Sequence, residues 1–126
     1  MGIGFTGFLG KMYEDGQAIF HQGETGDCMF LVQEGKVELL QRKGEMEFCL
    51  AVLDKGEYFG EKAIFGQAVR TATARSLGVA FVLSVKKKDF LSSIHHDPSL
   101  AFNMLKKMSA RIEELEAQLV RYGELA

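Results

Sequence analysis

The chain has 126 residues, of which 47% are hydrophobic and 25% are charged. This length and composition indicate a single folded domain and exclude a disordered chain. The net charge of −2 offers no broad basic field to a nucleic-acid backbone, and no apolar run approaches the ~20 residues that span a bilayer. We therefore expect neither a nucleic acid nor a membrane as a direct partner. The uncharged, glycine-rich start is unlike a signal peptide, so we expect a cytoplasmic protein.

The first two thirds of the chain show the pattern of an all-β domain. Short apolar runs recur at residues 18–20, 28–32, 37–40, 46–53 and 79–85. Glycine-bearing turns separate them, including Glu34-Gly35 and Gly78, where glycine adopts positive φ without steric strain. Strands at such regular spacing, with no helical pattern between them, predict a sandwich or jelly roll. We assign residues 1–11 to a glycine-rich lead and residues 12–86 to a β-roll.

Two stretches depart from this strand pattern. The segment GEKAIFG, residues 60–66, is short and alanine-containing, which favours one or two helical turns inserted between strands. From Lys87 the chain becomes helical, and Asp97-Pro98 then starts a second helix with proline at its first position. We expect that helix to run from about Ser99 to Tyr122. Residues 87–126 are thus predicted to form the helical part of the same domain.

The last predicted helix carries an apolar seam. Its spacing of three and four residues repeats over nearly three heptads, which is typical of a coiled coil. The seam contains Leu105, Met108, Ile112, Leu115 and Leu119, and continues to Tyr122. We expect the first half of the helix to cover the roll and the second half to pair with another copy in a homodimer. Packing of the whole seam on the roll is the alternative.

The stretch YFGEKAIFGQAVRTATARS, residues 58–76, holds the residue types that a buried cyclic phosphate requires. Such a site needs a planar cation that bonds two oxygens, main-chain N–H groups, a small residue for close approach and an acceptor for the ribose hydroxyl. Arg70 supplies the cation. Gly60 would begin the short helix, and Ala63 would lie at its base as the small residue. Glu61 would repel the phosphate, so we expect it to accept from the 2′-hydroxyl.

This stretch resembles the phosphate-binding cassette of the cyclic-nucleotide-binding domain family. That family includes catabolite activator protein, the regulatory subunits of cAMP-dependent protein kinase and nucleotide-gated channels. The matching residues are Phe59-Gly60-Glu61, Lys62, Ala63, Ile64 and the segment Arg70-Thr71-Ala72-Thr73-Ala74. The spacing between Glu61 and Arg70 matches that of the kinase members of the family. The stretch from Tyr13 to Leu40, with its glycine turns, also resembles the family's first four strands.

The resemblance implies a fold and a function. The fold would be an eight-stranded β-roll, or jelly roll, with a short phosphate-binding helix and two C-terminal α-helices, the last acting as a lid over the base. The function would be that of a regulatory sensor domain that binds cAMP or cGMP and couples binding to movement of its C-terminal helix. The predicted phosphate and ribose contacts are Gly60, Glu61, Lys62, Ala63, Arg70 and Thr71.

Several roles stay open at this stage. The Thr71 hydroxyl suits the phosphate or the amino group of a guanine, so it leaves cAMP and cGMP both possible. Val52, Leu53 and Val69 either line the base or fill the core. Arg111 either stacks on the purine or is an exposed helix charge.

An alternative function is a degenerate roll that serves dimerisation or partner docking without binding a nucleotide. An enzyme is not expected, because the chain shows no nucleophile–base pair and no metal-ligand spacing. His21, His95 and His96 do not have the arrangement of a metal triad. We expect no metal and no cofactor, with the cyclic nucleotide as the ligand.

Overall fold

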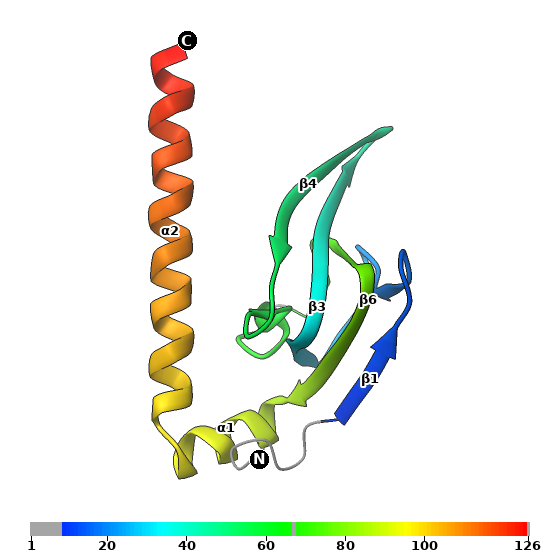
Figure 1. Cartoon of the computed structure of the whole chain (residues 1–126), viewed down its shortest axis with the longest axis vertical. Coiled ribbons are helices and arrows are strands. Elements are labelled where there is room, and N and C mark those ends of the chain that lie inside the picture. The colour runs from blue at the N-terminus through cyan, green and yellow to red at the C-terminus, as the bar shows by residue number, and fades with distance from the viewer. Residues whose placement is uncertain (1–8, 67, 126) are drawn as a thin grey trace.

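The computed structural model describes residues 9–66 and 68–125, in which six strands precede two α-helices (Figure 1). The strands are β1 (Leu9–Tyr13), β2 (Ala18–Phe20), β3 (Cys28–Lys43), β4 (Met46–Leu53), β5 (Tyr58–Phe59) and β6 (Thr73–Lys86). All pair antiparallel in one sheet of order β1-β6-β3-β4, with β2 also pairing with β6 and β5 with β3. The helices are α1 (Lys87–His96) and α2 (Ser99–Leu125).

The prediction of a mainly β domain with two C-terminal helices is confirmed, but the described residues contain six strands and not eight. Two predicted turns cause the difference, because Glu34-Gly35 lies inside β3 and Gly78 inside β6. At Gly35 the β3–β6 register shifts, and the positive φ of 82° bends the strand without ending it. A Cβ at this position would overlap the carbonyl oxygen of Val79, so only glycine fits.

The expected short phosphate-binding helix is also corrected. Residues Glu61–Ala63 form a single 3₁₀ turn, η1, in place of an α-helix. Gly60 precedes the turn in the left-handed conformation, with φ 72° and ψ 17°. The backbone N–H of Ile64 closes the turn by donating to the carbonyl of Glu61 at 3.0 Å. The left-handed Gly60 therefore changes the direction of the chain directly after β5.

Two clusters of buried side chains hold the domain together. The first fills the inside of the roll and includes Phe30, Val32, Val37, Phe59 and Val82. The second joins the roll to both helices and consists of Met29, Ile64, Val85, Phe90 and Met104. Because side chains alternate along a strand, β3 can direct Phe30 into the roll and its neighbour Met29 toward the helices.

The helices begin where the sequence predicts. The first starts at Lys87, and the second follows Asp97-Pro98, whose aspartate oxygen accepts from the Ser99 backbone N–H and hydroxyl. α1 lies at the foot of the sheet and α2 rises beside the β3–β4 hairpin (Figure 1). Neither described helix is long and apolar enough to cross a membrane. Residues 9–11 of the predicted lead belong to β1, and residues 1–8 lie outside the described residues.

Candidate functional site

The backbone of Arg70 is fixed by pairing with a distant turn. The N–H of Gly23 donates to the carbonyl of Arg70, and the N–H of Arg70 donates to the carbonyl of Glu24, both at 2.8 Å. The N–H of Gly26 donates to Ala68 at the same distance. Arg70 therefore lies in a short ladder just before β6.

The guanidinium of Arg70 is buried, with the residue only 7% exposed. Its Nη1 donates to the carbonyl of Gly60 at 3.0 Å and its Nη2 to the carbonyl of Cys28 at 2.7 Å. The Cζ atom lies 4.3 Å from the centroid of the Phe20 ring and 5.5 Å from that of Phe30. None of the ion pairs among the described residues includes Arg70. The cation is therefore held by carbonyl oxygens and aromatic rings, without a neutralising carboxylate.

Two glycines make room for this guanidinium. A Cβ on Gly26 would overlap its Nη2, Nε and Cζ atoms. A Cβ on Gly60 would lie 2.8 Å from Nη1, and the positive φ at Gly60 would strain any other residue. Both glycines are thus required for the arginine to sit where it does.

The residues predicted to bind the phosphate and ribose lie together. An inner pocket of about 150 Å³ is lined by Gly60, Glu61, Lys62, Ala63, Arg70 and Thr71, joined by Phe20, Leu39, Leu50, Val69 and Ala72. Lys62 is exposed, whereas Glu61, Ala63 and Thr71 are half-buried. The amides of Glu61 and Lys62 come first in the 3₁₀ turn, so the turn itself provides no acceptor for them.

An outer pocket of about 520 Å³ lies between this site and α2. It shares Leu39, Glu61 and Lys62 with the inner pocket, which makes the two neighbouring compartments of one site. Leu53 and Arg111, two of the predicted base contacts, line the outer pocket, and Nη2 of Arg111 donates to the carbonyl of Leu50 at 2.9 Å.

The other two predicted base contacts are placed differently. Val69 is 53% exposed and lines the inner pocket. Val52 is 44% exposed and belongs to the lining of neither pocket. Its neighbours Ala51 and Leu53 are buried, so strand alternation directs Val52 to the opposite face of β4.

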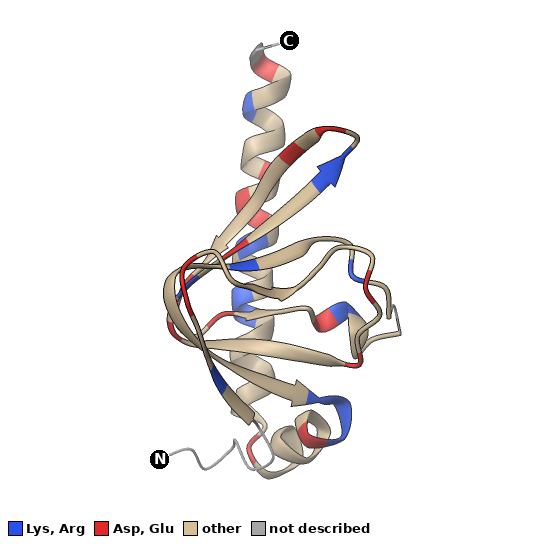
Figure 2. Ribbon diagram, turned by 90° about the vertical axis from the view of Figure 1, so that its right-hand side faces the viewer, with Lys and Arg blue, Asp and Glu red and all other residues tan. Residues whose placement is uncertain are grey.

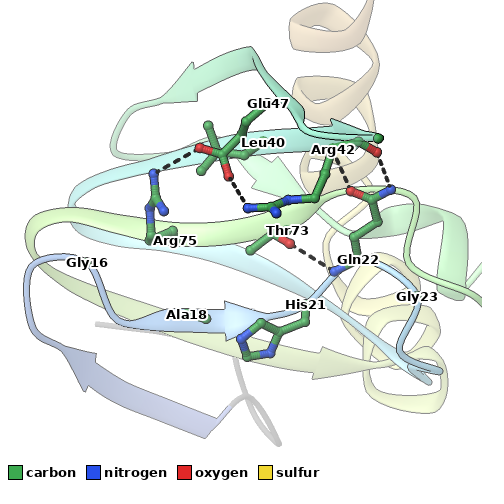
Figure 3. Close-up of a pocket in the computed structure, with 11 residues that line it drawn as sticks. Gly16, Ala18, His21, Gln22, Gly23, Leu40, Arg42, Glu47, Thr73 and Arg75 are labelled. Carbon is green, nitrogen blue, oxygen red and sulfur yellow. Dashed lines mark hydrogen bonds and ion pairs between the residues drawn. The ribbon is translucent and has the colours of Figure 1, made fainter.

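A larger groove of about 770 Å³ opens between β2 and the β3–β4 hairpin (Figure 3). It also contains arginines, but these are compensated. Arg75 lies 3.2 Å from Glu38 and 3.9 Å from Glu47, and Arg42 lies 3.8 Å from Glu47. The groove is therefore a less suitable anion site than the inner pocket. The described residues contain no group of three or more histidine, cysteine, aspartate or glutamate side chains placed to hold a metal ion.

Sequence reasoning missed several residues of the site. Phe20 and Gly26 are far from the cassette in sequence, whereas Leu50 lies on the nearby β4, and the folded topology brings all three to the site. The one available signal was the glycine-bearing turn between β2 and β3. Its composition indicated a turn but did not indicate which side chain it would accommodate.

The comparisons identify the family. Residues 11–97 match the cyclic nucleotide-binding domain, and the chain belongs to that family. The chain is 33% identical over 113 residues, 89% of its length, to the cyclic AMP receptor protein of Thermus thermophilus, and spans 52% of that protein. It is 40% identical over 82 residues, 62% of its length, to the cGMP-dependent protein kinase egl-4 of Caenorhabditis elegans, and spans 10% of that protein. The family resemblance seen in the sequence is thus confirmed.

A solved structure agrees with this assignment. The crystal structure of Thermus thermophilus catabolite activator protein superposes with a TM-score of 0.78 and 31% identity, covering 93% of this chain and 55% of that one. The chain spans about half the length of the two Thermus thermophilus proteins and 10% of the kinase. The comparisons therefore concern the binding domain and not the whole relatives.

Tyr58 lies where the outer pocket meets the second buried cluster. Burial raises its pKa from 10.0 to about 12. Burial likewise raises the pKa of Tyr13, with a further contribution from the charge of Cys28. Both phenols are therefore favoured in the neutral form by the folded state.

We predict that stability falls at high pH because of Tyr58. Its contribution is fully present below pH 10, where the unfolded phenol is neutral, and is lost as pH rises through about 12. Urea unfolding followed across this window measures the loss. Tyr58→Phe should reduce this loss of stability at high pH. The part of the loss that is due to Tyr13 should remain. A tyrosinate absorbance titration in which Tyr58→Phe removes no late step would contradict the assignment.

Proposed function

We propose that this domain is a regulatory sensor that binds cAMP or cGMP in the two-compartment site and transmits binding to α2. The observation that carries the proposal is the buried guanidinium of Arg70, which has no carboxylate partner among the described residues. An uncompensated buried charge is costly, and a ring phosphate supplies the missing negative charge. The relatives include a cyclic AMP receptor protein and a cGMP-dependent protein kinase, which supports this ligand class.

Each residue of the site then has a role. Arg70 and the first amides of η1 bind the phosphate, with Gly60 and Ala63 allowing close approach. Glu61 accepts from the ribose 2′-hydroxyl, and Thr71 adds a hydroxyl beside the phosphate. Lys62 contributes positive charge at the rim.

The base enters the outer pocket in this proposal. Leu53 and Arg111 line that pocket, whereas Val69 contacts the ligand from the inner one. The ligand itself takes the place of any cofactor, and the domain performs no chemistry on it.

We predict that Arg70→Ala weakens cyclic-nucleotide binding at least tenfold, because a charge-assisted pair to phosphate contributes ~1.5–3 kcal/mol. Isothermal titration with cAMP and cGMP measures the change. Arg70→Lys keeps the charge but loses the planar fork, and should also bind more weakly. Arg75→Ala is the matched control, since Arg75 is paired to Glu38 in the other groove and should leave affinity unchanged.

Equal affinity in the wild type and in folded Arg70→Lys would refute the proposed role. The alternative function, dimerisation or docking without a nucleotide, would be favoured if neither nucleotide raised the melting temperature of the wild type. A ligand that binds only the folded state must raise it by mass action.

Coupling to α2 follows from how the site is built. Ile64, directly after η1, packs in the second cluster with Phe90 of α1 and Met104 of α2. Farther along, Arg111 of α2 bonds the carbonyl of Leu50, a residue that also lines the inner pocket. A ligand that contacts η1 and fills the outer pocket therefore makes different contacts when α2 occupies a different position. The resulting difference in affinity is what shifts the populations of those positions.

We predict that saturating cAMP or cGMP slows amide hydrogen exchange both at residues 60–72 and in α2. The physical reason is that closing α2 over the base stabilises the helix locally. In Arg111→Ala the slowing at residues 60–72 should remain while that in α2 diminishes. Slowing at residues 60–72 with unchanged exchange throughout α2 of the wild type would refute the coupling but leave binding intact.

The proposal includes a homodimer formed through α2. Four seam residues remain largely exposed, with Leu105 at 63%, Ile112 at 56%, Leu115 at 42% and Leu119 at 71%. Met108, the fifth, is half-buried, and it lines the outer pocket together with Ile112 and Leu115. Basic and acidic residues follow one another along the helix, which suits pairing between copies (Figure 2). The heptad repeat favours a second copy of α2 as the partner of this face.

We predict that Leu119→Glu converts the dimer to a monomer, because it places a charge in the apolar seam. Analytical ultracentrifugation measures the change. Val120→Glu is the matched control, since Val120 is 62% exposed on the same helix but outside the seam, and should remain dimeric. A wild type that sediments as a monomer, or equal dissociation by both variants, would refute the interface.

A further inference from the structure

The ring of Phe20 lies against the guanidinium of Arg70 at the floor of the inner pocket. The Cζ atom is 4.3 Å from the ring centroid, within the range in which a cation is attracted to an aromatic face. Phe20 is the last residue of β2, and the arginine precedes β6, so the contact joins residues that are 50 positions apart. Nothing in the cassette itself indicates this partner.

Phe20 is itself held by other rings. Its centroid lies 5.5 Å from that of Phe30 and 6.0 Å from that of Phe59, and the Phe30 and Phe59 rings stack at 5.3 Å. Phe30 and Phe59 are buried, with exposures of 8% and 2%. The ring under the guanidinium is thus part of a rigid aromatic cluster and cannot turn away without disturbing the core.

The chemistry of this contact suits an anion site. A carboxylate would hold the arginine in place, but it would neutralise the cation and occupy its N–H groups. An aromatic ring attracts the cation and accepts no conventional hydrogen bond from it. The carbonyls of Gly60 and Cys28 take two of the five N–H groups of a guanidinium, so three remain for a ligand.

We infer that Phe20 is a positioning residue for the phosphate ligand: its ring holds the guanidinium of Arg70 in a fixed orientation and leaves the three remaining N–H groups free. This inference rests on the proposed function and adds a residue of β2 to the determinants of binding. Phe20 acts through Arg70, since orienting the fork in advance reduces the ordering that binding would otherwise require.

We predict that Phe20→Leu weakens binding of cAMP or cGMP by roughly three- to thirtyfold, the range expected for loss of a cation–aromatic contact. Phe20→Tyr keeps the ring and should retain most of the affinity. Isothermal titration measures both. Val82→Ala is the control for packing, because Val82 belongs to the buried cluster that contains Phe30 but lines neither pocket, and it should destabilise the fold while the folded protein keeps its affinity.

A second measurement does not depend on ligand binding. In the wild type, the Nε–H resonance of Arg70 should be shifted by the aromatic ring current and protected from exchange with solvent. Both features should diminish in Phe20→Leu and remain in Val82→Ala. If the wild type binds neither nucleotide, the proposed function fails, while this resonance still reports on the contact. An unchanged resonance in Phe20→Leu, or equal loss of affinity in Phe20→Leu and Val82→Ala, would overturn the inference.

Discussion

The buried guanidinium of Arg70 determines how the surrounding chain must fold. Its charge cannot be left among apolar side chains, so the protein places two carbonyl oxygens and an aromatic ring against it. Those partners come from β2, β3 and the residue before η1. The turn before β3 contributes Gly26, whose missing side chain leaves the space that the cation occupies. One side chain thus explains the conformations of several separate segments.

The other arginines on the sheet show that this arrangement is not a general feature of the fold. Arg75 and Arg42 are held by glutamates in the groove of Figure 3. The nearby carboxylates offset the charge of these arginines and leave little to attract an anion. Arg70 differs because its partners orient it without cancelling its charge. Proteins often tolerate an energetically unfavourable arrangement at a functional site, and the buried guanidinium of Arg70 is such an arrangement.

Much of the site could be predicted because its residues are close in sequence. The segment from Gly60 to Thr71 contains all six predicted phosphate and ribose contacts, and all six line one pocket. Phe20 could not be predicted, because its contact depends on how β2 pairs with β6. The strand count was wrong for a similar reason: Gly35 supports a bend within β3, and composition alone does not distinguish that bend from a turn. The two helices had clear start signals and were predicted closely.

The position of the β4 irregularity explains how the pocket reaches the long helix. The β3–β4 pairing shifts register after Leu39, and Leu50 is the residue of β4 left out of the paired ladder. Its carbonyl is therefore available to Arg111 of α2, while its side chain lines the inner pocket. At the other end, Ile64 connects the phosphate turn to the cluster that seats Met104. The helix is thus tied to the site at two separated points, and a ligand that changes either contact alters the energy of its position.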